Sequence, residues 1–228
     1  GQSCVLIAGR EEGMQRDYWY DSRRAFDDLE SPADTGRRAA RRTVERLGSR
    51  KIGTAQAPVL FAPEVARSLL GHLVSAVSGS SLYRNASFLR DAAGEALFPD
   101  WLDLVEQPRL PRGPASTSFD AEGVATRERK LIDGGILTGY VLSSYSGRRL
   151  GLESTGNAGG IHNLLAEGPA MPHEELLEAI GTGLLTGDQP QTLLTGPLRE
   201  AFAAGDPYAA LVAGMQTAPG QDPVNRML

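Results

Sequence analysis

The stretch KLIDGGILTGYVLSSYS, residues 130–146, decides the fold, because it contains two β-rich runs around Asp133, Gly134 and Gly135. Glycines in this position supply the positive φ angles that a tight turn between antiparallel strands requires. The stretch therefore predicts a β-hairpin, the clearest one in the chain. A second hairpin is predicted near the start, where residues 2–8 and 15–21 are separated by the glycine-bearing turn GREEG.

Two helices are predicted between these hairpins. Residues 32–47 follow Ser31, a favourable N-cap, begin with proline and stop before Gly48, which together are typical helix boundaries. Residues 63–78 also begin with proline, follow the short strand-like run APVLFAP, and place their apolar side chains on one half of the helical wheel. The elements predict an α+β fold that is mainly antiparallel β-sheet, sandwich- or barrel-like, with helices packed on it.

The last sixty residues differ in character from the rest. MPHEELLEAI begins as a helix and LREAFAA, residues 198–204, has a helical pattern, but the intervening segments are rich in proline, glycine and glutamine. We therefore expect one domain over residues 1–166 and a divergent, partly helical segment over residues 167–228 with a frayed tail. Because the chain opens on Gly1, we also expect it to be part of a longer natural product.

Composition narrows the class of function. The chain has 228 residues, a formal net charge of −5 and one cysteine, Cys4. The acidic balance argues against a nucleic-acid partner, since phosphate binding needs clustered cations. One cysteine excludes an internal disulfide, and no apolar run suits a signal segment or a membrane span, so a cytoplasmic location is expected. The basic run at residues 37–42 has helical spacing and is interpreted as a solvated helix face.

His72 raises the question of a metal site on the second predicted helix. A zinc-protease helix of the H-E-x-x-H type presents two histidines one turn apart, with a glutamate as base. Here Leu73 follows His72, and Ala76 stands one turn later. The residues favour a histidine at the boundary of the apolar face, hydrogen-bonded locally. The literal His-Glu pair at residues 173–174 is interpreted as the first turn of a helix.

The glycine-rich stretch STGNAGGIHN, residues 154–163, has the chemistry of a loop. It lacks the ending of a P-loop and the spacing of a dinucleotide-binding turn. Its glycines are interpreted as positions where the backbone turns tightly or approaches another chain. Asn157, His162 and Asn163 are polar enough to line a cleft. The acidic pair at residues 120 and 122 could perform acid–base work, but a turn beside a strand is favoured.

A family resemblance is carried by APVLFAPEVARSLLGHLVSAVSGSSLYRNASFL, residues 57–89, and ASTSFDAEGVATRERKLIDGGILTGYVLSSYSGRRLGLESTGNAGGIHN, residues 115–163. In one register over residues 2–166 the chain resembles the PmbA/TldE-type subunits of the TldD/PmbA metalloprotease family. The match is to the later half of that family's chain. After residue 166 the sequence departs from the family pattern.

The resemblance implies a cytoplasmic heterodimer in which a TldD-like and a TldE-like subunit act on peptides or unfolded segments. In the family, the zinc belongs to a TldD helix with the motif H-E-x-x-x-H, and in this register Gly71, His72 and Ala76 occupy the three motif positions. The resemblance therefore implies no catalytic residue, metal or cofactor in this chain, with zinc in the TldD-like partner. It implies no nucleic-acid or membrane partner, and a possible homodimer when the chain is isolated.

On this basis we expect a non-catalytic subunit that shapes a peptide cleft. The candidates for the cleft or the interface are His72, Asn157, Gly159, Gly160, His162, Asn163, Asp133 and Gly134. Two alternatives stay open. One is an autonomous metal-dependent peptidase with a metal held by His72, His162 and nearby carboxylates. The other is a degenerate fragment that acts only as an interaction module.

Overall fold

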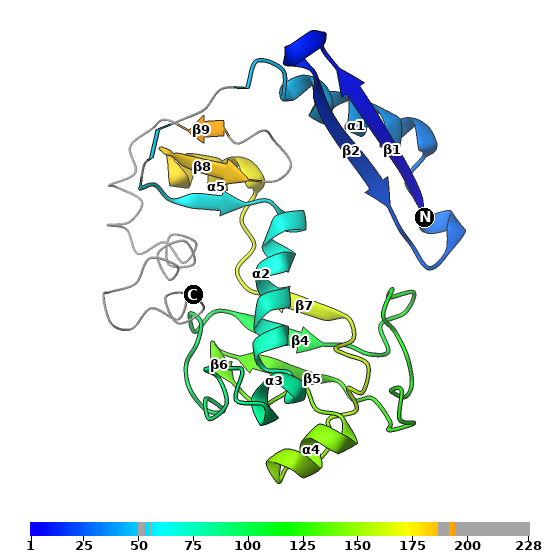
Figure 1. Ribbon diagram of the computed structural model, residues 1–228, viewed down its shortest axis with the longest axis vertical. Helices are drawn as coiled ribbons and strands as arrows, with labels where there is room; N and C mark the ends of the chain where they lie inside the picture. The colour runs from blue at the N-terminus through cyan, green and yellow to red at the C-terminus, as the bar shows by residue number, and fades with distance from the viewer. Residues whose placement is uncertain (50–52, 55, 187–191, 195–228) are drawn as a thin grey trace. The chain divides into compact units, whose positions relative to one another are not determined.

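The computed structural model describes residues 1–49, 53–54, 56–186 and 192–194. They fall into two compact units, one of residues 1–66 with the strands that follow residue 180, and the other of residues 67–179. Figure 1 labels the elements of both units, which are described separately. The helix and the frayed tail predicted for residues 198–228 lie outside the described residues.

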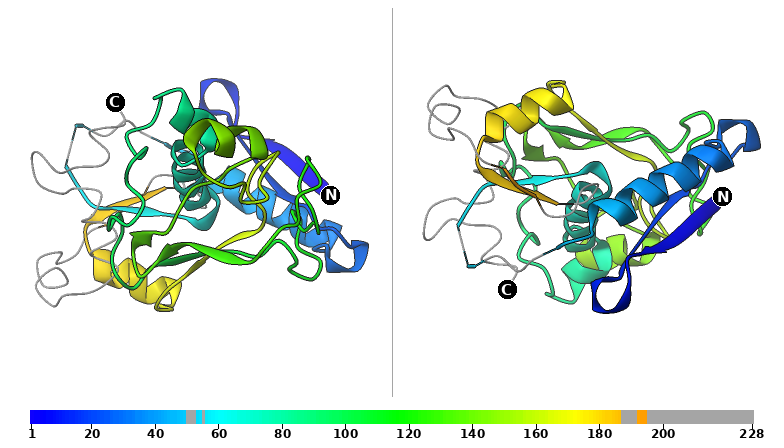
Figure 2. Two further views of the ribbon diagram at one scale, coloured as in Figure 1. Left: turned by 90° about the horizontal axis from the view of Figure 1, so that it is seen from below. Right: turned by 90° about the horizontal axis from the view of Figure 1, so that it is seen from above.

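The first unit contains the predicted N-terminal hairpin. Strands β1 (Gln2–Ala8) and β2 (Gln15–Asp21) pair antiparallel in full register, with a short 3-10 turn at Glu11–Gly13 between them. After a second such turn, Phe26–Asp28, helix α1 (Pro32–Glu45) packs on one face of the hairpin (Figure 2). The predicted N-cap is confirmed, because the Ser31 hydroxyl accepts a hydrogen bond from the main-chain N–H of Asp34 at 3.1 Å.

A three-stranded sheet completes the first unit. Strand β8 (Gly183–Thr186) lies in its centre, pairing parallel with β3 (Val59–Phe61) and antiparallel with β9 (Thr192–Leu194). The strand predicted in APVLFAP is therefore present. Its partner lies far along the chain, in the segment that the sequence analysis separated as divergent.

The second unit is built on a four-stranded antiparallel sheet with the order β6-β5-β4-β7. Its strands are β4 (Asp103–Glu106), β5 (Arg129–Asp133), β6 (Ile136–Leu137) and β7 (Leu164–Glu167). The hairpin predicted at Asp133, Gly134 and Gly135 is confirmed as the β5–β6 turn. Gly135 has a φ of 77°, and a Cβ there would lie 2.2 Å from the carbonyl oxygen of Phe98, so the turn requires glycine.

The β4–β5 pairing contains a bulge. Leu104 pairs with Ile132, but the next residue of β4, Val105, pairs with Lys130, so Leu131 is the extra residue of β5. Leu131 and Ile132 are both completely buried although they are adjacent. After the bulge, Glu106 on β4 stands opposite Arg129 on β5.

Four helices lie wholly or mostly in the residues of the second unit. They are α2 (Pro63–Ala76), which begins in the first unit, α3 (Gly79–Tyr83), α4 (Ser144–Leu150) and α5 (His173–Ile180). Leu73 at the end of α2 and the neighbouring Val77 share one apolar cluster with Leu104, Leu131 and other buried residues of the sheet. Burial of each such side chain contributes about 1.5–3 kcal/mol, so this cluster fixes the sheet against the helix.

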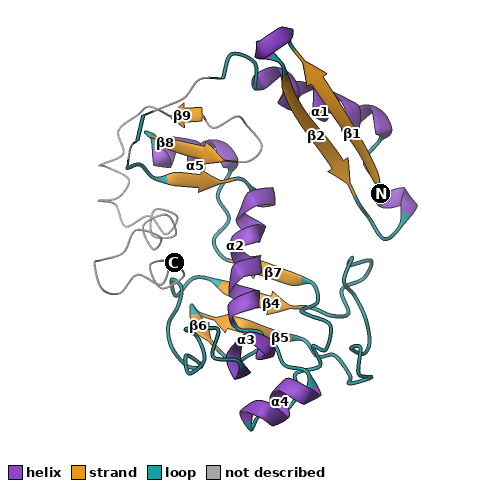
Figure 3. Cartoon of the chain, viewed as in Figure 1, coloured by secondary structure: helices purple, strands orange, loops and turns teal. Residues whose placement is uncertain are grey.

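The second β-rich run of the opening stretch is shorter than its composition suggests. Strand β6 ends at Leu137, and the serines that follow begin helix α4 instead (Figure 3). The side chains of Ser143 and Ser146 cap each other's main-chain N–H groups, which satisfies donors that a strand would have paired with a neighbour. Serine capping therefore starts a helix at the end of this run, where the composition indicates a strand.

The α+β class with predominantly antiparallel pairing is confirmed. Both predicted helices are present, and each ends two residues before its expected end. Among the helices that the structure describes, none combines the length and apolar character needed to cross a membrane.

Candidate functional site

The glycine-rich segment 154–163 is held against the end of β4 by Glu106. This side chain is only 1% exposed. Its Oε1 atom accepts hydrogen bonds from the main-chain N–H of His162 at 2.9 Å and from Asn157 Nδ2 at 2.6 Å. The ring Nδ1 of His162 lies 2.8 Å from the same oxygen. One buried carboxylate oxygen therefore fixes two of the predicted site residues.

Arg129 supplies the cation that this carboxylate needs. Its Nε donates to Glu106 Oε2 at 2.8 Å, its Nη1 to the carbonyl oxygen of Tyr140 at 2.8 Å, and its Nη2 to Asn157 Oδ1 at 3.1 Å. A buried ion pair is tolerated when its remaining donors and lone pairs are also hydrogen-bonded, and this network meets that condition. We call Glu106, Arg129, Asn157 and His162 the buried polar network.

The network sets the charge of its central carboxyl. Burial raises the pKa of Glu106, but the N–H of His162 and the hydrogen bond and charge of Arg129 together lower it more. The pKa therefore lies below the ordinary value, and Glu106 is ionised at neutral pH. An ionised carboxylate only accepts hydrogen bonds, so Glu106 has no proton to donate to a substrate.

Asp120 anchors the other side of the glycine-rich segment. Its Oδ1 accepts from the N–H groups of Glu122 and Val124, both at 2.9 Å, and its Oδ2 from the N–H of Ala158 at 2.9 Å. Burial raises the pKa of Asp120, and these three donors lower it to below its usual value. Because Glu122 accepts instead from the N–H of Ser144 at 2.7 Å, the two acids form a turn rather than a catalytic pair.

An open pocket of about 320 Å³ lies beside this loop. Its lining is Thr117, Phe119, Asp120, Ala121, Ala158, Gly159, Gly160, Ile161 and His162. Three predicted cleft residues, Gly159, Gly160 and His162, therefore line one pocket, and Asn157 lies directly behind it in the buried polar network. The pocket combines a flat stretch of main chain with one imidazole and the exposed ring of Phe119.

Asn163 is not among the residues that line the pocket. Its Nδ2 donates to the carbonyl oxygen of Gln107 at 2.8 Å and to Ser116 Oγ at 2.7 Å, and its Oδ1 accepts from the N–H of Ala115 at 2.9 Å. These bonds tie the loop after β4 to the start of β7. The contacts of Asn163 are those of a structural link between two loops.

Asp133 and Gly134 lie at the opposite end of β5 from Arg129. The N–H of Gly134 donates to Asp103 Oδ1 at 2.7 Å, and Lys130 Nζ bridges Asp103 and Asp133 at 2.7 and 2.6 Å. Four strand residues span about 13 Å, so this hairpin is separate from the pocket. The structure thus does not bring all the predicted cleft residues together.

His72 is exposed on α2, with Gly71 beside it and Ala76 one turn later. Among the described residues, no three histidine, cysteine, aspartate or glutamate side chains are grouped so that they could hold a metal ion. The His-Glu pair at residues 173–174 opens helix α5, as expected.

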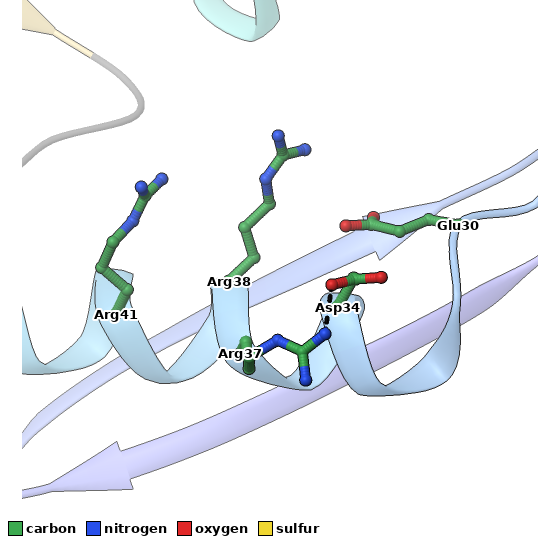
Figure 4. A pocket seen from close by; sticks show the side chains of 5 residues that line it. All are labelled: Glu30, Asp34, Arg37, Arg38 and Arg41. Carbon is green, nitrogen blue, oxygen red and sulfur yellow. Dashed lines mark hydrogen bonds and ion pairs between the residues drawn. The ribbon is translucent and has the colours of Figure 1, made fainter.

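A second pocket, of about 420 Å³, lies on α1 in the first unit and is lined by Glu30, Asp34, Arg37, Arg38 and Arg41. Figure 4 shows Arg38 and Arg41 extending from the same side of the helix, while Arg37 turns to pair with Asp34. The guanidinium of Arg38 lies 4.6 Å from the centre of the Trp19 ring. All three arginines are exposed, as expected for a solvated helix face, but Arg42, the fourth arginine of the predicted basic run, is not: its side chain is 11% exposed and its Nε lies 3.6 Å from Asp17 Oδ2.

Comparison with known proteins gives a consistent answer. The profile of the PmbA/TldA metallopeptidase C-terminal domain matches residues 54–196, and that of the PmbA/TldA metallopeptidase central domain matches residues 1–47. The chain belongs to the PmbA/TldA metallopeptidase family. Both pocket and buried polar network lie within the C-terminal domain match. The domain division that we expected at residue 166 stays a prediction.

Individual relatives support the same family. The chain is 51% identical to Metalloprotease PmbA of Escherichia coli O157:H7 over 183 residues, covering 80% of this chain and 40% of that protein. It is 44% identical to the Metalloprotease PmbA homolog of Haemophilus influenzae over 199 residues, covering 85% of this chain and 44% of that protein. The chain therefore spans less than half the length of these curated relatives.

Solved structures resemble the fold. A candidate DNA gyrase modulator from Bacteroides thetaiotaomicron matches with a TM-score of 0.74 and 29% identity, covering 81% of this chain and 42% of that one. TldE from Thermococcus kodakarensis matches with a TM-score of 0.64 and 25% identity, covering 80% of this chain and 44% of that one.

The two charged residues at the centre of the site were not predicted from the sequence. Glu106 and Arg129 stand at strand ends in DLVE and RKLID, where charged residues are ordinary. One signal was available for Glu106. It stands two residues after Leu104, and residues two apart on a strand share a face, so its carboxylate points to the buried side. The sequence holds no comparable signal for Arg129, because the face of the sheet on which its side chain lies depends on the bulge in β5.

Proposed function

We propose that this chain forms the non-catalytic, TldE-type part of a two-subunit metallopeptidase and shapes the cleft that holds the peptide. The zinc belongs to a TldD-type partner in this proposal, and the pair acts in the cytoplasm on peptides or unfolded segments. The observation that carries the proposal is the set Gly71, His72 and Ala76 at the positions where the family resemblance places the metal motif. Of these three, only His72 has a side chain that binds metals.

The chemistry of the pocket supports a binding role. A general acid or base needs a group that can exchange a proton with the substrate. The carboxylates nearest to His162, those of Glu106 and Asp120, are occupied by hydrogen bonds from their own chain. Their oxygens hold the glycine-rich loop in place. The loop and the exposed ring of Phe119 are then a prepared surface for a ligand.

These hydrogen bonds to Glu106 and Asp120 also argue against the alternative that the chain is an autonomous metal-dependent peptidase. That alternative needs carboxylates beside His162 with lone pairs free for a metal ion. Glu106 Oε1 already accepts from three donors, and Oε2 accepts from Arg129. Moving these oxygens to a metal would take the carboxylate acceptor away from the guanidinium of Arg129 and from the Asn157 amide in the interior, which is costly.

Co-purification with a TldD-type subunit tests the proposal, followed by a peptide-cleavage assay of each protein alone and of the two together. The expected result is a stable complex, cleavage by the pair, and no cleavage by this chain alone. A variant of the partner without its zinc ligands is the matched control and removes all cleavage. Cleavage by this chain alone would overturn the assignment, and so would failure of the two proteins to associate.

A further inference from the structure

The ring of His162 is held in one orientation with one nitrogen left over. Its side chain is 10% exposed, and its Nδ1 lies 2.8 Å from Glu106 Oε1. The contacts of the ring in the described part of the chain are all made by Nδ1, so Nε2 has no partner there. Since His162 also lines the pocket, its remaining nitrogen is available to a molecule that enters it.

The tautomer of His162 follows from the charge of its neighbour. Glu106 is ionised and can only accept, so the proton between the two groups belongs to Nδ1 of the imidazole. In the neutral ring Nε2 then carries a lone pair and no proton. With the ring neutral, the pocket offers a hydrogen-bond acceptor in a fixed direction, in the same way that a buried carboxylate orients histidines in enzymes and metal sites.

The main chain around His162 offers further hydrogen-bonding groups. No hydrogen bond within the described residues uses the N–H or C=O of Gly159 or of Ile161. Neither Gly159 nor Gly160 carries a Cβ to cover this backbone, and both are exposed. The segment on either side is fixed by Asp120 and Glu106, so a ligand would not have to order it.

The remaining lining decides which ligand fits. The carboxylate of Asp120 is neutralised by three N–H donors, and Phe119 presents a ring that is 61% exposed. A pocket with main-chain donors and acceptors, one imidazole acceptor and an apolar ring is complementary to the main chain of an extended peptide. A volume of about 320 Å³ is at the lower end of ligand pockets, which suits a short stretch of peptide.

We infer that this pocket binds an extended peptide segment, with a peptide N–H donating to Nε2 of His162 and the main chain of Gly159 and Ile161 pairing with the neighbouring peptide groups. The inference rests on the proposed function, because that function supplies the peptide. It goes further by naming the subsite and the atom that recognises the main chain. His162 is a binding residue in this account, and Glu106 is the residue that positions it.

Nuclear magnetic resonance of the isolated chain tests the inference. The chain has three histidines, and a His162→Gln variant assigns the ring-nitrogen signals of residue 162. At a pH at which the ring is neutral, and before ligand is added, the spectrum is expected to show the proton on Nδ1 and the lone pair on Nε2. The probe is an alanine hexapeptide, acetylated at its N-terminus and amidated at its C-terminus. Its addition is expected to shift the Nε2 signal of His162 and to leave that of His72 unchanged.

A second peptide keeps the test independent of any effect on folding. In it the central amides are N-methylated, which removes the donor but preserves the length and the side chains. Loss of one hydrogen bond is expected to weaken binding about three- to tenfold. Equal binding of both peptides overturns the inference, and so does the absence of a shift at His162 or of any binding of the unmodified peptide.

This experiment separates the inference from the proposed function. The peptide is titrated into this chain alone, without the TldD-type partner, so the result does not depend on cleavage or association. Binding at His162 by a chain that fails to associate with the partner would sustain the subsite and reject the subunit. Association and cleavage without any effect at His162 would do the reverse.

Discussion

Acidic and basic side chains form ion pairs at both ends of the β4–β5 pair, but one end is buried and the other is exposed to solvent. At one end Glu106 faces Arg129, with side-chain exposures of 1% and 20%. At the other end Lys130 bridges Asp103 and Asp133, whose side chains are 26% and 58% exposed. The lysine itself is 43% exposed. The carboxylates of the two pairs on β4, Asp103 and Glu106, are only three residues apart, and Lys130 directly follows Arg129.

The difference shows what each pair can contribute. In the interior a charge that loses its partner keeps its desolvation cost, so every member of the buried polar network depends on the others. At the surface, water and salt replace a lost partner at little cost. We therefore expect the pocket to depend on the buried end, and the hairpin turn to depend on its glycine backbone rather than on its charges.

The largest effect is expected for Arg129→Met, which leaves Glu106 charged and unpaired. Breaking a buried pair costs about 3–5 kcal/mol, and the loss should appear as a lower urea midpoint with an unchanged slope. Arg148→Met, at an exposed position of α4, is the matched control and should unfold like the parent chain. Equal urea midpoints for the two variants would show that the buried ion pair contributes no more to stability than an exposed arginine does.

Gly135→Ala is expected to have the next largest effect, at the solvated end. A non-glycine residue at this φ costs about 1–3 kcal/mol, and the added Cβ also meets the main chain of residues 98 and 99. Thermal unfolding measures the loss. Gly139→Ala, where a Cβ meets nothing within 4 Å, should be close to neutral. If both variants unfold at the same temperature, the glycine backbone at residue 135 does not stabilise the β5–β6 turn.

The pH dependence of stability sharpens the comparison further. The pKa of Glu106 lies below its ordinary value of 4.5, and that of Asp103 lies below 3.8, because Lys130 and the N–H of Gly134 favour its ionised form. A carboxyl group whose pKa is lower in the folded state than in the unfolded state stabilises the fold. This stabilisation is complete at pH values above the unfolded-state pKa, and it is lost as the pH falls through the folded-state pKa. Unfolding free energy should therefore be flat near neutrality and fall below about pH 4.5.

Two isosteric variants show how much of the stability lost at low pH comes from each end of the β4–β5 pair. Both Glu106→Gln and Asp103→Asn should flatten the decline when unfolding is followed by fluorescence from pH 7 to pH 2. In 1 M salt the effect of Asp103→Asn should shrink, because its partner is exposed to screening, whereas that of Glu106→Gln should persist. The same salt response in both variants would contradict the assignment of a buried and a solvated end.

The smallest effect is expected for Lys130→Ala. Both of its ion pairs are exposed, although they raise the pKa of the lysine well above its usual range. Because solvent screens such pairs, the urea midpoint should not change measurably. A midpoint drop as large as that of Arg129→Met would remove the distinction between the two ends.

Much of the fold was predictable because its signals are local. Ser31 and Pro32 mark the start of α1, and the two glycines after Asp133 mark the β5–β6 turn. Each of these acts within a few residues of the element it defines. The start of α4 shows the limit, since serine capping competes there with an apolar run that indicates a strand.

The site was only partly predictable, because its contacts are long-range. The loop chemistry of residues 154–163 and the polar character of Asn157 and His162 were visible in the sequence. Their common partner, Glu106, is more than fifty residues away, as the bonds from Asn157 and His162 show. Nothing local distinguishes this glutamate or Arg129 from charges at a solvated strand end. Only the folded sheet reveals that they meet.

The extra leucine in β5 has a consequence for how this site could change over time. Adjacent strand residues point to opposite faces, so the bulge at Leu131 decides that Arg129 turns inward and Lys130 outward. Swapping one amino acid for another cannot exchange those two orientations. The same sequence paired without the bulge would exchange them, because Lys130 would then stand opposite Glu106 and place an ammonium group where a guanidinium now contacts three partners. The irregular pairing of this strand therefore matters to the site as much as its composition.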